Sequence, residues 1–521
     1  MPNRNTDAVF LLIQSLEKSE KRNFKLYVKR NSGTANLKVI QLFDALEKME
    51  TYDEALLLRK TKSLKKEQLS NLKAHLHRLI LSSLRLLKHE DNITLQLNEQ
   101  MDFARILYNK GLYIQSLKVL ERSKEIARAY HQVTYLQQIL FFEKKIEALY
   151  ITRSMQDRAD QLTGESEEVN RKLSLISQLS DLSLQLYSWY IRNGVARNRR
   201  DLTEVKLFFE TYLPPEASRI RGFYEQLYLY QSYCWYAFIR QDFLQYYRYT
   251  QKWVDLFASW PEMTEVETAH YIKGMHNLMA AHFDLQNAAR LVETISEFEK
   301  FTRRKIVLQN DNYKILCFQY LYLAKINLHF IEGTFTEGLR LVPHLEEQLE
   351  QYDQYLDRHR VLVFYYKIAC LYFGSGKNEK AIDYLTKIIN WKVDLRTDLQ
   401  CYARLLHLIA HYELGNFNLL EYLIKSVYRF MAKMENLSEV EEQVFDFLRQ
   451  SFTLQPQELK PAFEQLLNRI RKFEGNRYES RAFVYLDIIS WLESKISEVD
   501  VQTIIRKKYK RSNQRTVSRK A

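Results

Sequence analysis

The sequence predicts an all-α protein, and three observations carry this prediction. Glycine and proline are scarce, at 12 and 7 of 521 residues, whereas strands and hairpins need these residues at their turns. Apolar residues make up 46 % of the chain and charged residues 27 %, which is the balance of a folded globular protein. Pairs of helical stretches separated by short polar turns also recur along the chain. We therefore expect a helix content above about 70 %, far over the usual third.

Five helical stretches are expected in the first 90 residues, which carry a net charge of +8. In the last of them, apolar residues at spacings of three and four define one helical face. We expect residues 1–94 to be a basic N-terminal helical region. It is either a small bundle of the helix-turn-helix kind or a cap on the helices that follow. The five stretches are 6–16, 19–31, 36–49, 53–61 and 66–88.

One face of the second stretch is strongly basic. Lys18, Arg22, Lys25 and Lys29 are spaced 4, 3 and 4 residues apart, so their side chains share that face. Such a stripe is either an ordinary solvated helix face or a surface that contacts phosphates. These four residues are the first set of predicted nucleic-acid-binding residues.

Beyond residue 94 a two-helix pattern recurs. A helix rich in Tyr, Leu and Ala ends in a short polar turn, and an amphipathic helix follows. The seven intervals from turn 111 to turn 415 average about 43 residues. A glycine at the turn supplies the left-handed residue that ends the first helix, and neighbouring pairs must stack to bury their apolar faces. The turns are expected near Gly111, Gln156, Gly194, Gln241, Gln286, Gly333, Gly376 and Gly415.

Three copies of this pattern, at 102–127, 365–389 and 408–430, resemble the tetratricopeptide repeat family. The first copy has the family's order of large, small and turn residues in Phe103, Ala104, Leu107, Gly111, Tyr113, Ser116 and Leu120. The resemblance implies a right-handed α-solenoid of stacked antiparallel helix pairs over 95–435, with a concave groove that binds a protein or peptide. Because the mean period exceeds the family's 34 residues, we expect longer helices.

A dense aromatic run lies between residues 224 and 253. Within it, Tyr228, Gln231, Trp235 and Phe238 are spaced 3, 4 and 3 residues apart and share one face of a first helix. In the resembled family the equivalent face lines the ligand groove, which makes these four the predicted partner-binding residues. The alternative is that they belong to the core, because stacked helix pairs need large amphipathic side chains as fillers.

The C-terminal part divides into closing helices at 436–500 and a basic tail at 501–521. Residues 505–521 carry eight basic side chains and no acidic one, and we expect this tail to be disordered. A tail of this charge binds polyanions at low salt with little regard to sequence. Lys507, Lys508, Lys510 and Arg511 are therefore the second set of predicted nucleic-acid-binding residues.

The sequence offers no catalytic constellation: it contains neither a G-x-S-x-G motif nor a Rossmann glycine run. We expect no enzyme activity, no cofactor and no metal site. Cys234, Cys317, Cys370 and Cys401 lie in apolar helical contexts without C-x-x-C spacing, so we expect buried thiols rather than disulfides. The apolar run near the N-terminus is too short for a signal peptide or a membrane span, and we expect a cytoplasmic protein.

These observations favour a non-enzymatic helical-repeat scaffold or adaptor that binds a protein or peptide partner in its groove. The alternative is a regulatory factor associated with RNA or DNA, which would use the basic N-terminal region and the basic tail. Neither interpretation involves a membrane.

Overall fold

In the computed structural model the chain is built from helices. Helices account for 85 % of it and the described residues contain no strand, which confirms the all-α prediction and the expected helix content. The structure describes residues 7–30, 35–61, 65–88, 92–150, 156–215, 217, 220–353, 355–391, 397–433, 439–451, 454–474, 476 and 487–518. Both ends of the chain, and with them the predicted tail residues Arg519 and Lys520, lie outside these ranges.

The chain forms two compact units, Met1–Asn170 and Arg171–Ala521. The boundary falls inside one long helix, α9 (Gln156–Asn193). The predicted repeat region, 95–435, therefore extends over both units, and each unit is described by itself below.

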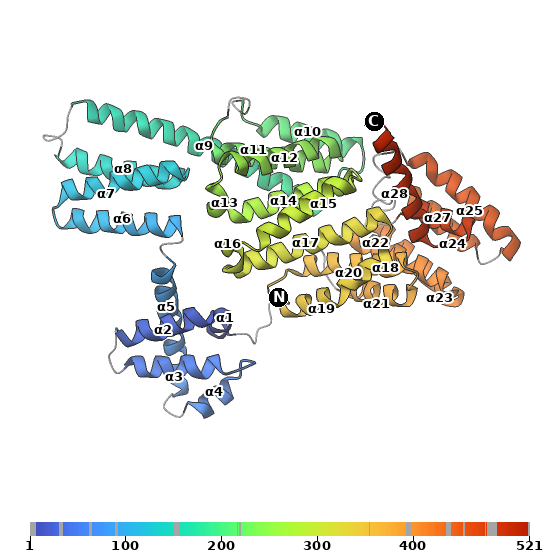
Figure 1. Ribbon diagram of the computed structural model, residues 1–521, viewed down its shortest axis with the longest axis horizontal. Coiled ribbons are helices and arrows are strands. Elements are labelled where there is room, and N and C mark those ends of the chain that lie inside the picture. Colours follow the sequence, from blue (N-terminus) through green and yellow to red (C-terminus); the bar gives the residue numbers. More distant parts are fainter. Residues whose placement is uncertain are drawn as a thin grey trace. The chain divides into compact units, whose positions relative to one another are not determined.

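The first unit begins with a bundle that has its own apolar core (Figure 1). Helix α2 packs on α3 and α5, and the rings of Phe24 and Phe43 lie 4.7 Å apart between α2 and α3. Asp7 caps α1 and also pairs with Lys73 of α5 at 2.9 Å, which fixes the start of the chain to the bundle. The helices are α1 (Ala8–Ser15), α2 (Lys18–Arg30), α3 (Ala35–Glu47), α4 (Glu54–Lys60) and α5 (Lys66–Leu87).

Three further helices of the first unit stack in chain order: α6 (Ile93–Asn109), α7 (Tyr113–Ala129) and α8 (Val133–Tyr150) (Figure 1). A buried ion-pair network joins α7 and α8 to the start of α9. Its centre is Lys124, which is 1 % exposed and whose Nζ lies 2.6 Å from a carboxylate oxygen of Glu143 and 3.3 Å from one of Glu165.

In the second unit most helices pack on the next one along the chain. Helices α11 and α12 form one pair, α20 and α21 another, and α14 and α17 link neighbouring pairs (Figure 1). The helices are α10 (Arg199–Tyr212), α11 (Phe223–Ile239), α12 (Phe243–Ser259), α13 (Met263–Val266), α14 (Thr268–Asp284), α15 (Ala288–Thr302), α16 (Lys305–Leu308), α17 (Asp311–Glu332), α18 (Phe335–Gly338), α19 (Val342–Gln351), α20 (Arg358–Gly374), α21 (Asn378–Ile389), α22 (Thr397–Glu413), α23 (Phe417–Lys433), α24 (Glu439–Gln450), α25 (Pro456–Ile470), α27 (Ile488–Ser497) and α28 (Val501–Ser518).

Seven of the eight predicted turns have the left-handed backbone conformation that the sequence indicates. Left-handed φ angles occur at Gly111, Gly194, Gln241, Gln286, Gly333, Gly376 and Gly415. At Gly376 the amide donates to the carbonyl of Phe373, and the next amide donates to Tyr372, so the last carbonyls of α20 are satisfied. The eighth predicted turn, near Gln156, falls between α8 and α9, where residues 151–155 lie outside the described residues; Gln156 itself is the first residue of α9. His131, between α7 and α8, adds a left-handed turn that was not predicted.

We expect Gly376→Ala and Gly164→Ala to change stability in opposite directions. Gly376 has a φ of +78° and a Cβ atom there would meet open space, so alanine should cost about 1 kcal/mol of backbone strain alone. Gly164 lies exposed inside α9 with equal space and no left-handed φ, so alanine should stabilise the helix by about 0.5–1 kcal/mol. Thermal unfolding of the two variants tests the turn assignment, which fails if both shift the melting temperature upward.

The C-terminal segment is a helix, so the prediction of a disordered tail is wrong for residues 501–518. Ile504 is 9 % exposed, and Val501, Ile505 and Tyr509 pack against the apolar cores of the second unit. Polar contacts add to this docking: the hydroxyl of Thr336 donates to Gln502 at 3.0 Å. The helix forms because these apolar residues give α28 one face to bury, despite its high charge.

Candidate functional site

A strip of aromatic and basic side chains, made of three clusters of contacting groups, crosses helices α9, α11, α14, α17 and α20 of the second unit. It starts at Trp235 of α11, whose ring centroid lies 4.8 Å from that of Tyr187 and 5.5 Å from that of Tyr190, both on α9. Lys273 of α14 places its Nζ over the rings of Trp235 and Tyr187, at 5.6 and 5.0 Å from their centroids. These distances are in the range of cation–π contacts.

The strip continues one helical turn further along α14. The imidazole of His276 stacks on the ring of Tyr320 of α17, with centroids 3.9 Å apart and planes inclined by 12°. Arg360 of α20 places its guanidinium 5.1 Å from the centroid of the Tyr320 ring and donates a hydrogen bond of 3.2 Å to the Tyr320 hydroxyl. Tyr320 is thus shared between a histidine and an arginine from two other helices.

Lys367 of α20 ends the strip. Its Nζ donates to Oδ1 of Asn327 at 2.6 Å and lies over the rings of Phe283 and Phe330, at 5.5 and 5.1 Å from their centroids. Asp284, at the end of α14, has a carboxyl group whose negative charge attracts this lysine and raises its pKa. Hereafter the cationic strip means Lys273, His276, Arg360 and Lys367 with the aromatic rings that they contact.

The pKa values show that the basic groups of the cationic strip repel one another. Burial lowers the pKa of Lys273, and the charge of Arg360 lowers it further. Burial, followed by Arg360, Lys273 and Lys367, lowers the pKa of His276 to about 3, so its imidazole is neutral at pH 7. Burial lowers the pKa of Lys367 to about 8 against the attraction of nearby groups that include Asp284.

The nearby acid does not neutralise the cationic strip. Burial raises the pKa of Asp284 to about 7, and Lys367 only partly opposes this shift, so Asp284 carries a partial charge near neutral pH. Arg360 has a distant contact with Asp357, at 3.9 Å. Within the described part of the chain, Lys273, His276 and Lys367 form no ion pair. The arrangement therefore has the electrostatics of a site for an anionic group.

The predicted partner-binding residues on α11 lie at and beside one end of this strip. Trp235 belongs to it, and Phe238 packs on Tyr190 and on Tyr246 of α12 with ring centroids 5.3 and 5.1 Å apart. Tyr228 is half-buried against His270. Gln231 is only 7 % exposed and offers little surface to a partner. These four residues thus take part in packing between helices, and their role as partner contacts stays a prediction.

The first set of predicted basic residues is brought together on α2. Lys18, Arg22, Lys25 and Lys29 line a shallow hollow of about 440 Å³, together with Lys21, Leu26 and Glu47. Lys25 is not available to a ligand in the same way as the others, because its Nζ pairs with Asp44 at 2.8 Å and with Glu47 at 3.0 Å.

The second set of predicted basic residues is divided by the fold of α28. Lys508 pairs with Glu493 of α27 at 2.9 Å and donates to the Ser490 hydroxyl at 2.8 Å. Lys507, Lys510 and Arg511 are exposed and form no ion pair with a described residue. Lys508 therefore contributes to the packing of α28 on α27, and the four residues do not belong to a disordered tail.

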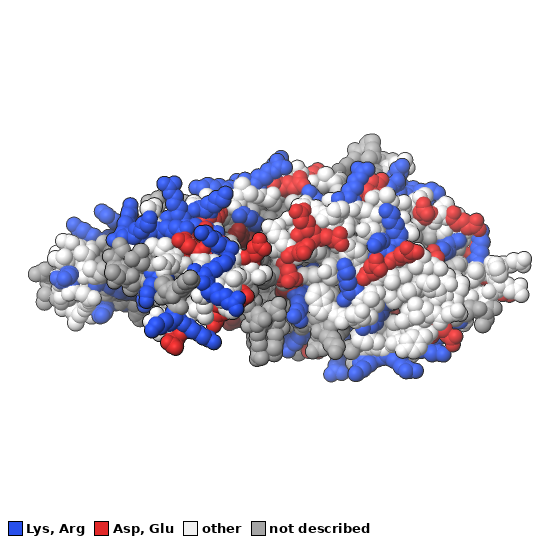
Figure 2. Space-filling model, turned by 90° about the horizontal axis from the view of Figure 1, so that it is seen from below, with Lys and Arg blue, Asp and Glu red and all other residues white. Residues whose placement is uncertain are grey.

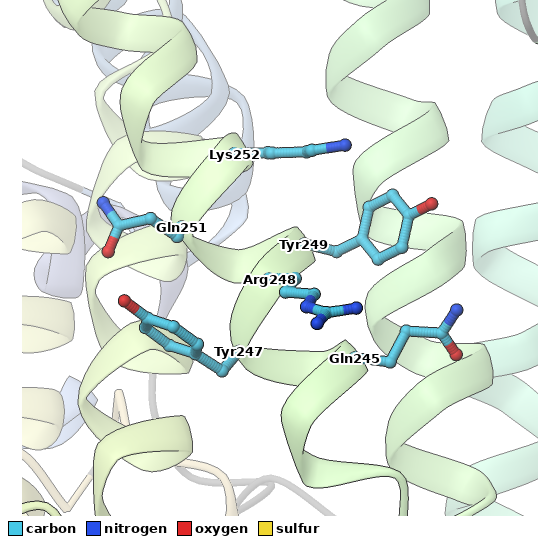
Figure 3. A pocket seen from close by; sticks show the side chains of 6 residues that line it. All are labelled: Gln245, Tyr247, Arg248, Tyr249, Gln251 and Lys252. Atoms are coloured by element: carbon cyan, nitrogen blue, oxygen red, sulfur yellow. The ribbon is translucent and has the colours of Figure 1, made fainter.

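Two hollows near α12 offer weaker sites. The first, of about 360 Å³, is lined by α12 alone, and its side chains diverge: Gln245, Arg248, Tyr249 and Lys252 point to one side, Tyr247 and Gln251 to the other (Figure 3). The second, of about 820 Å³, lies among α12, α14 and α15 and has acidic and basic residues in its lining. The first hollow has two basic residues, Arg248 and Lys252, which is fewer than the cationic strip has, and the second mixes acidic and basic residues.

Comparison of the chain with models of protein families and with curated proteins yields no match. Among the described residues, no group of three or more His, Cys, Asp or Glu side chains could hold a metal ion, and the four cysteines are buried thiols that form no disulfide. No described helix combines the length and the apolar character that crossing a membrane requires.

Proposed function

We propose that this protein is a non-enzymatic helical-repeat scaffold or adaptor that binds an acidic segment of a partner protein along the cationic strip. The observation that carries the proposal is the gathering of three cationic side chains, Lys273, Arg360 and Lys367, around the neutral imidazole of His276 and beside one partly charged acid. The proposal takes the helix pairs of the second unit to be a right-handed solenoid of antiparallel pairs, acting in the cytoplasm.

Physical chemistry favours an anionic ligand at this strip. A half-buried cation without a counter-charge costs free energy, and a carboxylate that contacts it offsets this cost. Arg360 can engage a carboxylate with two parallel hydrogen bonds, because its guanidinium is a planar fork. The rings of Tyr187, Tyr190 and Trp235 at one end offer apolar area of the kind found at the centres of protein interfaces. A short peptide with acidic residues and a large apolar residue fits both features.

A binding measurement with a defined probe tests the proposal. The probe is a fluorescein-labelled peptide of Glu, Leu and Gly, with a peptide of Lys, Leu and Gly as the control. We expect Lys273→Met/Arg360→Met to weaken binding of the acidic peptide at least about tenfold, through loss of two charge-assisted contacts. Arg248→Met/Lys252→Met on the exposed face of α12 removes the same charge and should have little effect.

The melting temperature separates binding from a structural role. Methionine at 273 removes a desolvated charge and keeps the apolar stem, so we expect the Lys273→Met variant to melt at the same temperature as the unmodified protein or higher. A clear loss of stability would make Lys273 a packing residue. Equal affinities of all variants for the acidic peptide, or tighter binding of the basic peptide, would refute the proposed function.

A further inference from the structure

The exposed face of α2 carries a dense group of positively charged side chains. Five basic residues, Lys18, Lys21, Arg22, Lys25 and Lys29, surround the hollow at Leu26, and Leu26 itself is 48 % exposed. Figure 2 shows Lys and Arg side chains gathered over the N-terminal helices. We call these five residues with Leu26 the α2 basic face.

The α2 basic face has an electrostatic cost in the free protein. Like charges three and four residues apart on a helix destabilise it, and the face contains several such pairs, among them 18/22 and 25/29. Glu47 and Asp44 of α3 pair with Lys21 and Lys25 at its inner edge. Lys18 and Arg22, both exposed, form no ion pair with any described residue. A ligand with closely spaced negative charges would relieve this repulsion.

We propose that the α2 basic face binds duplex DNA, as a function separate from partner binding by the second unit. Helix α2 has 13 residues and is about 20 Å long, and an α-helix fits the major groove, which is about 12 Å wide. From Lys18 to Lys29 the rise is about 16 Å, so these two and Arg22 can reach phosphates at several points along the groove edge. Leu26 between them offers methyl groups for contact with thymine methyls.

The local fold around α2 supports duplex DNA as the ligand of the α2 basic face. Helix α2 follows α1 after only Leu16 and Glu17, and it buries Phe24 and Val28 in the bundle core while its opposite side is exposed. A short turn before a helix that is packed on one side and exposed on the other is the arrangement with which helix-turn-helix proteins present a helix to DNA. A lipid surface fits less well, because an interfacial helix needs a broad apolar face, and the α2 basic face exposes one leucine.

Fluorescence anisotropy with the full chain tests this inference. The probes are a labelled duplex of about 20 base pairs and a single strand of the same sequence, each at about 50 and 200 mM salt. Lys18→Gln/Arg22→Gln/Lys29→Gln should weaken duplex binding at least tenfold at the lower salt concentration. If all three side chains contact phosphates, the slope of log affinity against log salt should flatten by about 2–3 units.

A matched variant distinguishes binding at the α2 basic face from binding that depends only on the net charge of the protein. Lys507→Gln/Lys510→Gln/Arg511→Gln removes three exposed charges from α28, and we expect it to weaken duplex binding less than threefold. Equal loss in both variants would show that only net charge acts and would overturn the inference. Absence of duplex binding at low salt, or tighter binding of the single strand, would overturn it as well. Circular dichroism of each variant checks that the helices are intact.

Discussion

Replacing Lys124 by methionine should destabilise the protein by about 3–5 kcal/mol, the usual cost of leaving a buried charge without its partner. Lys124 and Glu143 are each 1 % exposed, and their charged atoms are 2.6 Å apart between α7 and α8. Arg158 lies 3.4 Å from the other carboxylate oxygen of Glu143 but is itself 28 % exposed. It therefore compensates the buried charge of Glu143 less well than Lys124 does. Chemical denaturation followed by circular dichroism measures the change.

The double variant Lys124→Met/Glu143→Leu is the control for this prediction. Replacing a buried ion pair by apolar side chains of similar volume is often neutral or stabilising, because neither charge then has to be desolvated. We expect the double variant to recover most of the stability that Lys124→Met loses. The stability losses of Lys124→Met alone and of Glu143→Leu alone are then compared with the loss in the double variant. If the two single losses sum to the double loss, the two residues are not coupled and the buried network is wrongly assigned.

The destabilisation by Lys124→Met should also depend on pH. Burial raises the pKa of Glu143, while Lys124 lowers it, so loss of the lysine raises this pKa further. An acid whose pKa is raised in the folded state stabilises the fold while it is protonated, and this contribution is lost as the pH rises through the folded-state pKa. The variant should therefore lose less stability at acidic pH than at pH 7. An effect that is independent of pH would contradict the charge argument.

Local signals in the sequence were sufficient to predict the helical character of the chain and seven of its left-handed turns. The turn at Gln286 is an example: it lacks glycine, yet the polar run between two amphipathic stretches located it, and its φ is left-handed. The turn at His131 was not predicted, because the sequence around it contains no glycine, no proline and no long polar run. The C-terminal helix was missed because the count of basic residues outweighed the apolar spacing of Val501, Ile504, Ile505 and Tyr509, which would have indicated an amphipathic helix.

The cationic strip could not be predicted from a single sequence. Lys273 and Arg360 are 87 residues apart, and neither belongs to a motif. Only the packing of α14 and α20 against α17 brings Arg360 to Tyr320, on which His276 of α14 stacks, and that packing depends on long-range contacts that periodicity does not encode. The stripe on α2 was found because all of its members lie on one helix, where spacing alone determines which residues share a face.

Replacing Gly333 by alanine should displace α28 and destabilise the protein by at least about 2 kcal/mol. Gly333 has a φ of +66°, and a Cβ atom there would lie 2.6 Å from the backbone nitrogen of Arg506 and 2.8 Å from the carbonyl oxygen of Gln502. Backbone atoms cannot move aside by a rotamer change, so the whole helix has to shift. The contacts of α28 with α17 and with Thr336 and Glu337 would then be lost.

Limited trypsin digestion together with thermal unfolding measures this displacement. Lys507, Lys510 and Arg511 are exposed on α28 and should be cleaved faster once the helix leaves its docked position, because proteolysis requires local unfolding. Gly376→Ala is the matched control: it imposes similar backbone strain, at φ +78°, but its Cβ atom would have no neighbour within 4 Å. The difference between the two variants therefore isolates the contact with α28. Equal losses of stability, with no faster cleavage in the Gly333→Ala variant, would show that α28 does not dock at this turn.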